Sequence, residues 1–154
     1  MSTVNGLPAH VLLVHFIVVL APLTALLAIL CALWPAARRR FAWGVVALSV
    51  FVAALTPITT EAGEWLEDKV GKSPPLHIHT HLGDTMIYFA LALVVAALLL
   101  AVMHVREHRG MPLTRVLSMI VIAFVLVSSV ATMVQVYRIG DSGARVSWDE
   151  LEAT

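Results

Sequence analysis

Imidazole and carboxylate side chains recur at helical spacing around residue 80 of the chain. His77, His81, Asp84 and Tyr88 are separated by four, three and four residues. An α-helix turns about 100° per residue, so this spacing places all four side chains on one face. Zinc, copper and iron accept histidine and carboxylate together as ligands. The stripe therefore predicts part of a transition-metal site that faces the interior of a helical bundle.

The remaining ligands are expected from helices that pack against this stripe. His15 lies in the first apolar segment and Glu64 just after the end of the second, and both come to the same end of a bundle as His81. Facing helices of such bundles commonly hold metals through histidines and acids. We expect His15 and His81 to bind the metal. Glu64 or Asp84 would complete the shell, with His77 and His10 as outer ligands or as part of an entry path.

Haem b is the competing cofactor, since two histidines on different helices can bind it. His15 and His81 are again the natural pair, although the nearby carboxylates are unusual for a largely apolar haem pocket. A third interpretation is a buried hydrogen-bonded network of His15, His81 and Asp84 without any cofactor. His10 and His79 are interpreted as residues at the membrane interface or at the edge of the site.

The composition indicates the elements that must position these residues. Of the 154 residues, 60% are hydrophobic and 13% are charged, and the formal net charge is zero. So small a soluble domain could not bury this much apolar surface. A single cysteine excludes a disulfide framework, and the neutral charge argues against a nucleic-acid binder.

Four apolar segments are each long enough, at about 20 residues, to cross a bilayer as a helix. They cover about residues 11–34, 41–60, 82–105 and 113–136. We therefore predict an all-α integral membrane protein, a single domain over residues 1–154, built as an antiparallel four-helix bundle. The expected connections are residues 35–40, about 64–75, and 106–112. Small residues along the first segment predict a face for close helix packing, formed by Ala21, Ala25, Ala28 and Ala32.

Arginine distribution predicts the orientation. The first and third connections and the start of the last span carry six arginines against one acid, Glu107. These arginines are Arg38, Arg39, Arg40, Arg106, Arg109 and Arg115. Because short basic loops stay in the cytoplasm, both termini and the middle connection are expected on the extracytoplasmic side. The predicted site then lies near the extracytoplasmic face.

Several motifs resemble a bacterial family of small four-helix membrane proteins known as a domain of unknown function. The opening Leu7–Phe16, which contains His10 and His15, resembles the His-Pro-x-x-Val-His-Phe motif of that family. Residues 60–64, 81–84 and 140–144 also resemble its later motifs. Two departures stand out: Val11 follows His10 where the family usually has proline, and Asp141 stands where it commonly has histidine.

The resemblance implies the four-helix fold, a bacterial inner membrane and, through relatives fused to redox modules, electron transfer. Within the chain, Glu61-Ala62-Gly63 and Asp141-Ser142-Gly143 end the two halves alike and suggest a parallel two-fold repeat. The leading interpretation is a small membrane protein with a His and carboxylate metal site and a redox or metal-related role. One alternative is an accessory subunit or assembly factor of a larger membrane complex, or a homo-oligomer, without a cofactor. A metal-assisted hydrolase is a further alternative.

Overall fold

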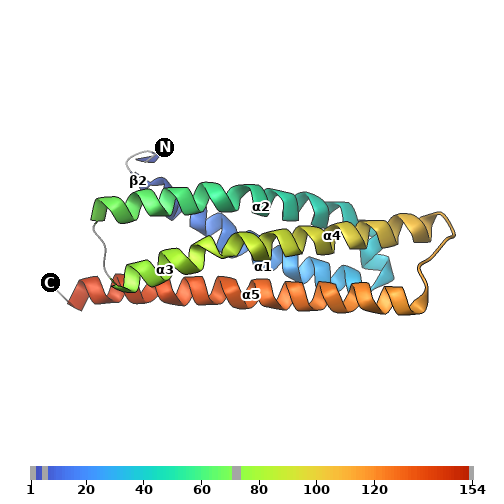
Figure 1. Ribbon diagram of the computed structural model, residues 1–154. Helices are drawn as coiled ribbons and strands as arrows, with labels where there is room; N and C mark the ends of the chain where they lie inside the picture. Colours follow the sequence, from blue (N-terminus) through green and yellow to red (C-terminus); the bar gives the residue numbers. More distant parts are fainter. Residues whose placement is uncertain (1–2, 5–6, 71–73, 153–154) are drawn as a thin grey trace.

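Long helices account for nearly all of the structure, a computed structural model that describes residues 3–4, 7–70 and 74–152. The helices are α1 (Ala9–Leu33), α2 (Pro35–Val70), α3 (Pro74–Asp84), α4 (Met86–His108) and α5 (Arg115–Glu152). They follow a small antiparallel ladder of β1 (Thr3–Val4) and β2 (Leu7–Pro8). Helices α3 and α4 run end to end as one rod, so the bundle has four rods (Figure 1).

Each rod packs against two neighbours. Helix α1 lies against α2 and α5, and the α3–α4 rod also lies against α2 and α5 (Figure 1). Four helical segments of the described chain are long and apolar enough to cross a membrane, Leu12–Leu33, Pro35–Lys69, Leu76–His108 and Arg115–Val146. This confirms the predicted all-α four-span bundle.

Helix α2 begins before and ends after its predicted apolar segment, and α5 continues well past the end of its own. Helix α2 begins at Pro35, a residue that suits the first helical position because its missing N–H has no intrahelical acceptor there. It continues to Val70, so residues 35–40 and 64–70 of the predicted connections are helical instead. Residues 71–73 of the second connection lie outside the part of the chain that the structure describes. Its 36 residues extend over roughly 54 Å at 1.5 Å per residue, well beyond a hydrocarbon core of about 30 Å.

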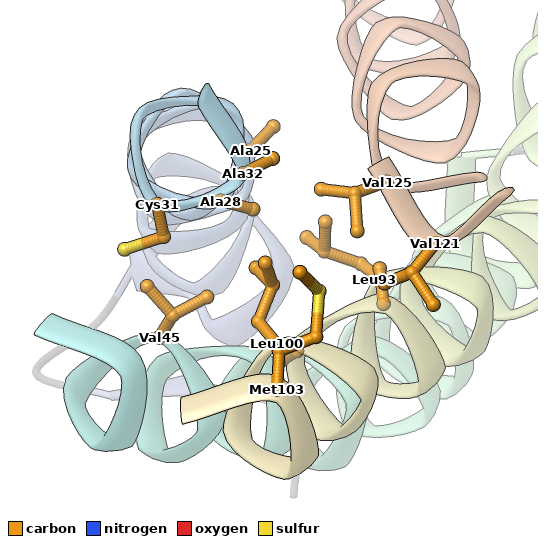
Figure 2. Packing of buried hydrophobic residues seen from close by; sticks show 12 residues of the cluster. Ala25, Ala28, Cys31, Ala32, Val45, Leu93, Leu100, Met103, Val121 and Val125 are labelled. Atoms are coloured by element: carbon orange, nitrogen blue, oxygen red, sulfur yellow. The ribbon is translucent and has the colours of Figure 1, made fainter. Parts of the chain in front are cut away.

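Small side chains form the seam between the rods. Ala21, Ala25, Ala28 and Ala32 are all buried, which confirms the predicted packing face of α1. Figure 2 shows three of these alanines turned toward Leu93 and Leu100 of α4 and Val125 of α5. Large apolar residues such as Phe16, Trp43 and Val127 are exposed on the outside, as expected for a surface that faces lipid.

The rod formed by α3 and α4 is interrupted at Thr85. The Gln135 side chain of α5 donates hydrogen bonds to the Leu82 carbonyl at 3.0 Å and to the Thr85 hydroxyl at 2.8 Å. The Thr85 hydroxyl in turn donates to the same carbonyl at 2.8 Å. Backbone groups freed inside an apolar bundle need such partners. Gln135, 3% exposed, therefore lets the rod break where α3 turns toward α5.

A buried arginine closes the end of the bundle that contains the α1–α2 connection. The Arg38 guanidinium, 4% exposed, donates to the carbonyls of Cys31 and Ala32 at 2.9 and 3.4 Å. It also donates to both carboxylate oxygens of Glu107 at 2.6 and 3.2 Å. Arg38 thus ties together the end of α1, the start of α2 and the end of α4.

Candidate functional site: a histidine pair

Two histidines from different rods meet at the other end of the bundle. The rings of His10 on α1 and His79 on α3 have their centres 6.4 Å apart and stand nearly perpendicular, at 85°. Both side chains are half-buried. Helix α3 brings His79 to this position because it packs against α2 and α5 below the break at Thr85.

The hydrogen bond of His10 fixes the position of its ring proton. Nδ1 of His10 lies 3.0 Å from the carbonyl oxygen of Thr59 on α2. A carbonyl oxygen only accepts, so Nδ1 must carry the proton and donate it. The neutral ring then has its lone pair on Nε2, which is the nitrogen available to bind a metal.

The same reasoning applies to His79 through a short relay. Nδ1 of His79 lies 2.9 Å from the Ser142 hydroxyl oxygen on α5, and this hydroxyl donates its own proton to the Ile139 carbonyl at 2.8 Å. The hydroxyl can therefore only accept from His79, whose Nδ1 must again be protonated. Both histidines thus keep Nε2 as the metal-binding atom.

Each ring lies against a glycine of the neighbouring rod. A Cβ atom added at Gly63 would lie 3.0 Å from Cε1 and Nδ1 of His10, and one added at Gly143 would lie 3.0 Å from Cε1 of His79. These separations are shorter than ordinary van der Waals contact, so a side chain at either position would require the histidine ring to shift by a few tenths of an ångström. The two glycines end the acid–small–Gly triplets of the sequence, and their matching contacts support the internal repeat.

A cavity of about 380 Å³ opens beside the two rings. This volume lies within the roughly 300–1,000 Å³ typical of ligand pockets. Helices α1, α2, α3, α4 and α5 all contribute to the wall, and the apolar part includes Val14, Ile17, Leu66, Leu76, Met86, Ile139 and Val146. Gly83 lines the cavity, and a Cβ atom added there would meet nothing within 4 Å.

Most of the residues predicted to hold a cofactor lie outside this pair. His15, His77, His81, Glu64 and Asp84 are all exposed, as is Tyr88. The expectation that the stripe of α3 faces the interior is therefore wrong. The reason is register: His79, two positions from His77 and His81, points into the bundle, and its neighbours point out. Only Glu64 and Asp84 of the predicted set also line the cavity.

Helix register also determines which of the two histidines of α1 faces the cavity. His10, Val14 and Ile17 share one face at spacings of four and three, and all three line the cavity. His15 lies one residue beyond Val14 and is turned away from that face. Within the described residues no group of three or more His, Cys, Asp or Glu side chains is arranged to hold a metal ion.

The sequence predicts His10 and His79 at the edge of the site, although a spacing pattern that favours buried positions for both is present. Each precedes small or apolar residues at spacings of four and seven: Val14 and Ile17 after His10, Gly83 and Met86 after His79. Gly63 of α2 lies against His10, and Gly143 of α5 lies against His79. Glu67, which falls in the predicted connection at about residues 64–75, is also buried and lines the cavity.

The chain belongs to the family described as "Predicted membrane protein (DUF2231)", which it matches over residues 6–151. This assignment agrees with the resemblance drawn from the motifs around His10, Glu61, His81 and Asp141. It identifies an integral membrane protein and carries no assigned activity. Neither the curated proteins nor the solved structures compared with this chain give a match.

Proposed function

We propose that this protein is a membrane-bound electron-transfer protein that holds haem b between His10 and His79. The observation that carries the proposal is the pair of rings whose Nδ1 atoms are both engaged by acceptors, at 3.0 and 2.9 Å. Each ring therefore offers Nε2 to a shared ligand. The proposal keeps the predicted class of cofactor and replaces His15 and His81 as the expected axial pair.

The number of ligands favours haem over a bare metal ion. A protein site for zinc or a similar ion needs three or four side chains. Haem supplies four ring nitrogens of its own, so two histidines would be enough to complete the coordination of its iron. The described residues bring together two histidines and no larger group of ligands. A site made by His15, His81, Glu64, Asp84 and His77 would require these exposed side chains to be rearranged.

The ring separation also supports the proposal. Metal–imidazole bonds of roughly 2.0–2.1 Å on both sides of one metal place the two ring centres about 6 Å apart. The observed distance between the centres is 6.4 Å. The observed separation of the ring centres is therefore compatible with two imidazoles that share one iron.

The surroundings suit electron transfer. Haem b supplies reversible one-electron chemistry when bound. His10 and His79 would both hold the haem, which suits electron transfer rather than the binding of a substrate. The chain's own residues hold the rings: Thr59 and Ser142 fix their orientation and proton, while apolar residues of four rods limit water. Such outer partners make the bound imidazole a stronger ligand and tune the metal.

The proposal also sets the place of the protein in the cell. We propose a bacterial inner membrane, with the His10–His79 end on the extracytoplasmic side, as the arginines at the opposite end favour. Electron transfer needs a donor and an acceptor, so the protein would act beside another redox protein of the membrane or with further copies of itself.

The absorption spectrum of the protein tests this proposal. The chain is expressed in cells supplied with haem precursor, purified in mild detergent and examined in oxidised and reduced states. We expect one bound haem with the spectrum of a low-spin, six-coordinate b-type protein. His10→Ala and His79→Ala should each lose this signature, whereas His15→Ala and His77→Ala, which alter exposed histidines of the same two helices, should keep it.

Two outcomes would overturn the proposal. Wild-type protein that stays colourless after haem supply and after addition of haemin would show that the protein does not bind haem. A signature that is lost in His15→Ala and His81→Ala but kept in His10→Ala and His79→Ala would show that His15 and His81, the pair expected from the sequence, hold the haem.

A further inference from the structure

A second histidine pair lies at the opposite end of the bundle, on the last turn of α4. The rings of His104 and His108 are stacked, with their centres 6.4 Å apart and their planes inclined by 13°. The Nδ1 atom of His104 is buried and has no hydrogen-bond partner among the described residues. A buried polar atom without a partner is costly, commonly about 1–3 kcal/mol, so this nitrogen points to an absent ligand.

His104 is also part of the wall of a small cavity of about 220 Å³. Its walls are Arg39, His104, Glu107 and His108. The carboxylate of Glu107 is already engaged on both oxygens by Arg38, so its charge is compensated. Arg39 is then the uncompensated charge of the cavity, beside two histidines. This charge disfavours a metal cation and favours an anion that accepts hydrogen bonds.

The position of the cavity identifies the kind of anion. Arg40, Arg106 and Arg109 are exposed at the same end of the bundle, and Trp34 there is 59% exposed. Tryptophan and arginine at the ends of membrane spans mark the level of the lipid headgroups. Basic pockets between spans at this level bind the headgroups of anionic lipids.

We infer that this cavity binds the phosphodiester of an anionic phospholipid. The Arg39 guanidinium supplies the charge and donates to the phosphate oxygens, while His104 supplies a second donor from inside the cavity. Arg38 contributes indirectly, because it holds Glu107 and prevents that carboxylate from repelling the phosphate. The acyl chains would lie along the exposed apolar surface of the bundle. This inference does not depend on the haem proposal.

Lipid retention tests the inference. Protein is reconstituted in bilayers of phosphatidylcholine with phosphatidylglycerol, extracted in mild detergent, and examined by native mass spectrometry for bound lipid. Wild-type protein should retain phosphatidylglycerol in preference to phosphatidylcholine. Removal of the charge in Arg39→Gln should lower that retention about five-fold, from an attraction of about 1 kcal/mol per basic residue. His104→Phe should lower it as well, and Arg39→Lys should keep most of it.

The control variant is Arg109→Gln, which removes one exposed arginine at the same end outside the cavity. It should retain phosphatidylglycerol like the wild type. Equal losses in Arg109→Gln and Arg39→Gln would overturn the inference, because a diffuse surface charge would then explain retention. Displacement of the lipid by millimolar inorganic phosphate, or no preference over phosphatidylcholine in the wild type, would also overturn it.

Discussion

Arg38 and Glu107 form a bidentate ion pair between α2 and α4, with donor–acceptor distances of 2.6 and 3.2 Å. The arginine is 4% exposed and the glutamate side chain 31% exposed. The same guanidinium reaches the carbonyls at the end of α1. Arg38, which the sequence predicts in a basic loop, is therefore a buried residue that connects three helices. This end of the bundle is fixed by polar contacts, and the other end contains the larger cavity.

Loss of the Glu107 charge should destabilise the protein. In Glu107→Gln the buried Arg38 loses its counter-charge, and we expect about 2 kcal/mol less stability, since hydrogen bonds to charged groups contribute about 1.5–3 kcal/mol. Thermal unfolding in detergent measures the change. The control is Asp141→Asn, which breaks the exposed Arg145–Asp141 pair and should cost less than about 0.5 kcal/mol. Equal effects of the two variants would contradict a structural role for Arg38.

A side chain at either contact glycine should disturb the histidine pair. In Gly63→Ala and Gly143→Ala the new Cβ atom would lie 3.0 Å from the ring of His10 or His79, and the ring must move. We expect weaker haem retention in both variants, measured by haem titration of the purified protein. Gly140→Ala is the matched control, because its Cβ meets nothing within 4 Å and alanine is favoured in helices by roughly 1 kcal/mol. Normal haem retention in Gly63→Ala would show that the contact is unimportant.

The Ser142 hydroxyl should affect haem binding without touching the haem. In Ser142→Ala the Nδ1–H of His79 loses the acceptor at 2.9 Å, so the ring is less well oriented. Outer partners of metal-binding histidines are commonly worth 10–100-fold in affinity, and we expect a loss of about ten-fold. The midpoint potential should shift as well. Ser128→Ala, on the same helix, removes a hydroxyl that bonds only its own helix and should leave both quantities unchanged.

Gln135 should be required for the break between α3 and α4. Gln135→Leu removes the donor to the Leu82 carbonyl and the Thr85 hydroxyl inside an apolar bundle. An unsatisfied buried group costs about 1–3 kcal/mol, and we expect a comparable loss of stability. Amide hydrogen exchange should rise around residues 82–88. A variant with unchanged exchange there would mean that the break is held by other contacts.

Apolar length and small-residue spacing were sufficient to predict the architecture. The four spans follow from runs too long and too apolar for a soluble fold, and the buried alanines of α1 follow from a spacing of three and four. The helix ends could not be predicted in the same way. Residues 61–70 and 137–152 are polar enough to resemble connections, yet they continue α2 and α5 beyond the apolar core.

The histidine pair lies at the end of the bundle where the sequence predicts a site, but on other helix faces than the predicted ligands. His77 and His81 form the more regular stripe with Asp84, and periodicity alone cannot show which face of a helix meets its neighbours. The interruption at Thr85 and the contact with Gly143 decide that His79 faces inward. Both features depend on contacts between rods, so they became visible only in the folded chain.

The larger cavity lies entirely at one end of the bundle, whereas the opposite half is filled by alanine, leucine and valine. If haem binds between His10 and His79 as proposed, an electron that arrives from the nearer water phase would cross only a small part of the insulating layer. The work done by a transmembrane voltage scales with the fraction of the field that a charge traverses. Redox chemistry at this position would be nearly insensitive to the energised state of the membrane and would exchange with partners on one side alone.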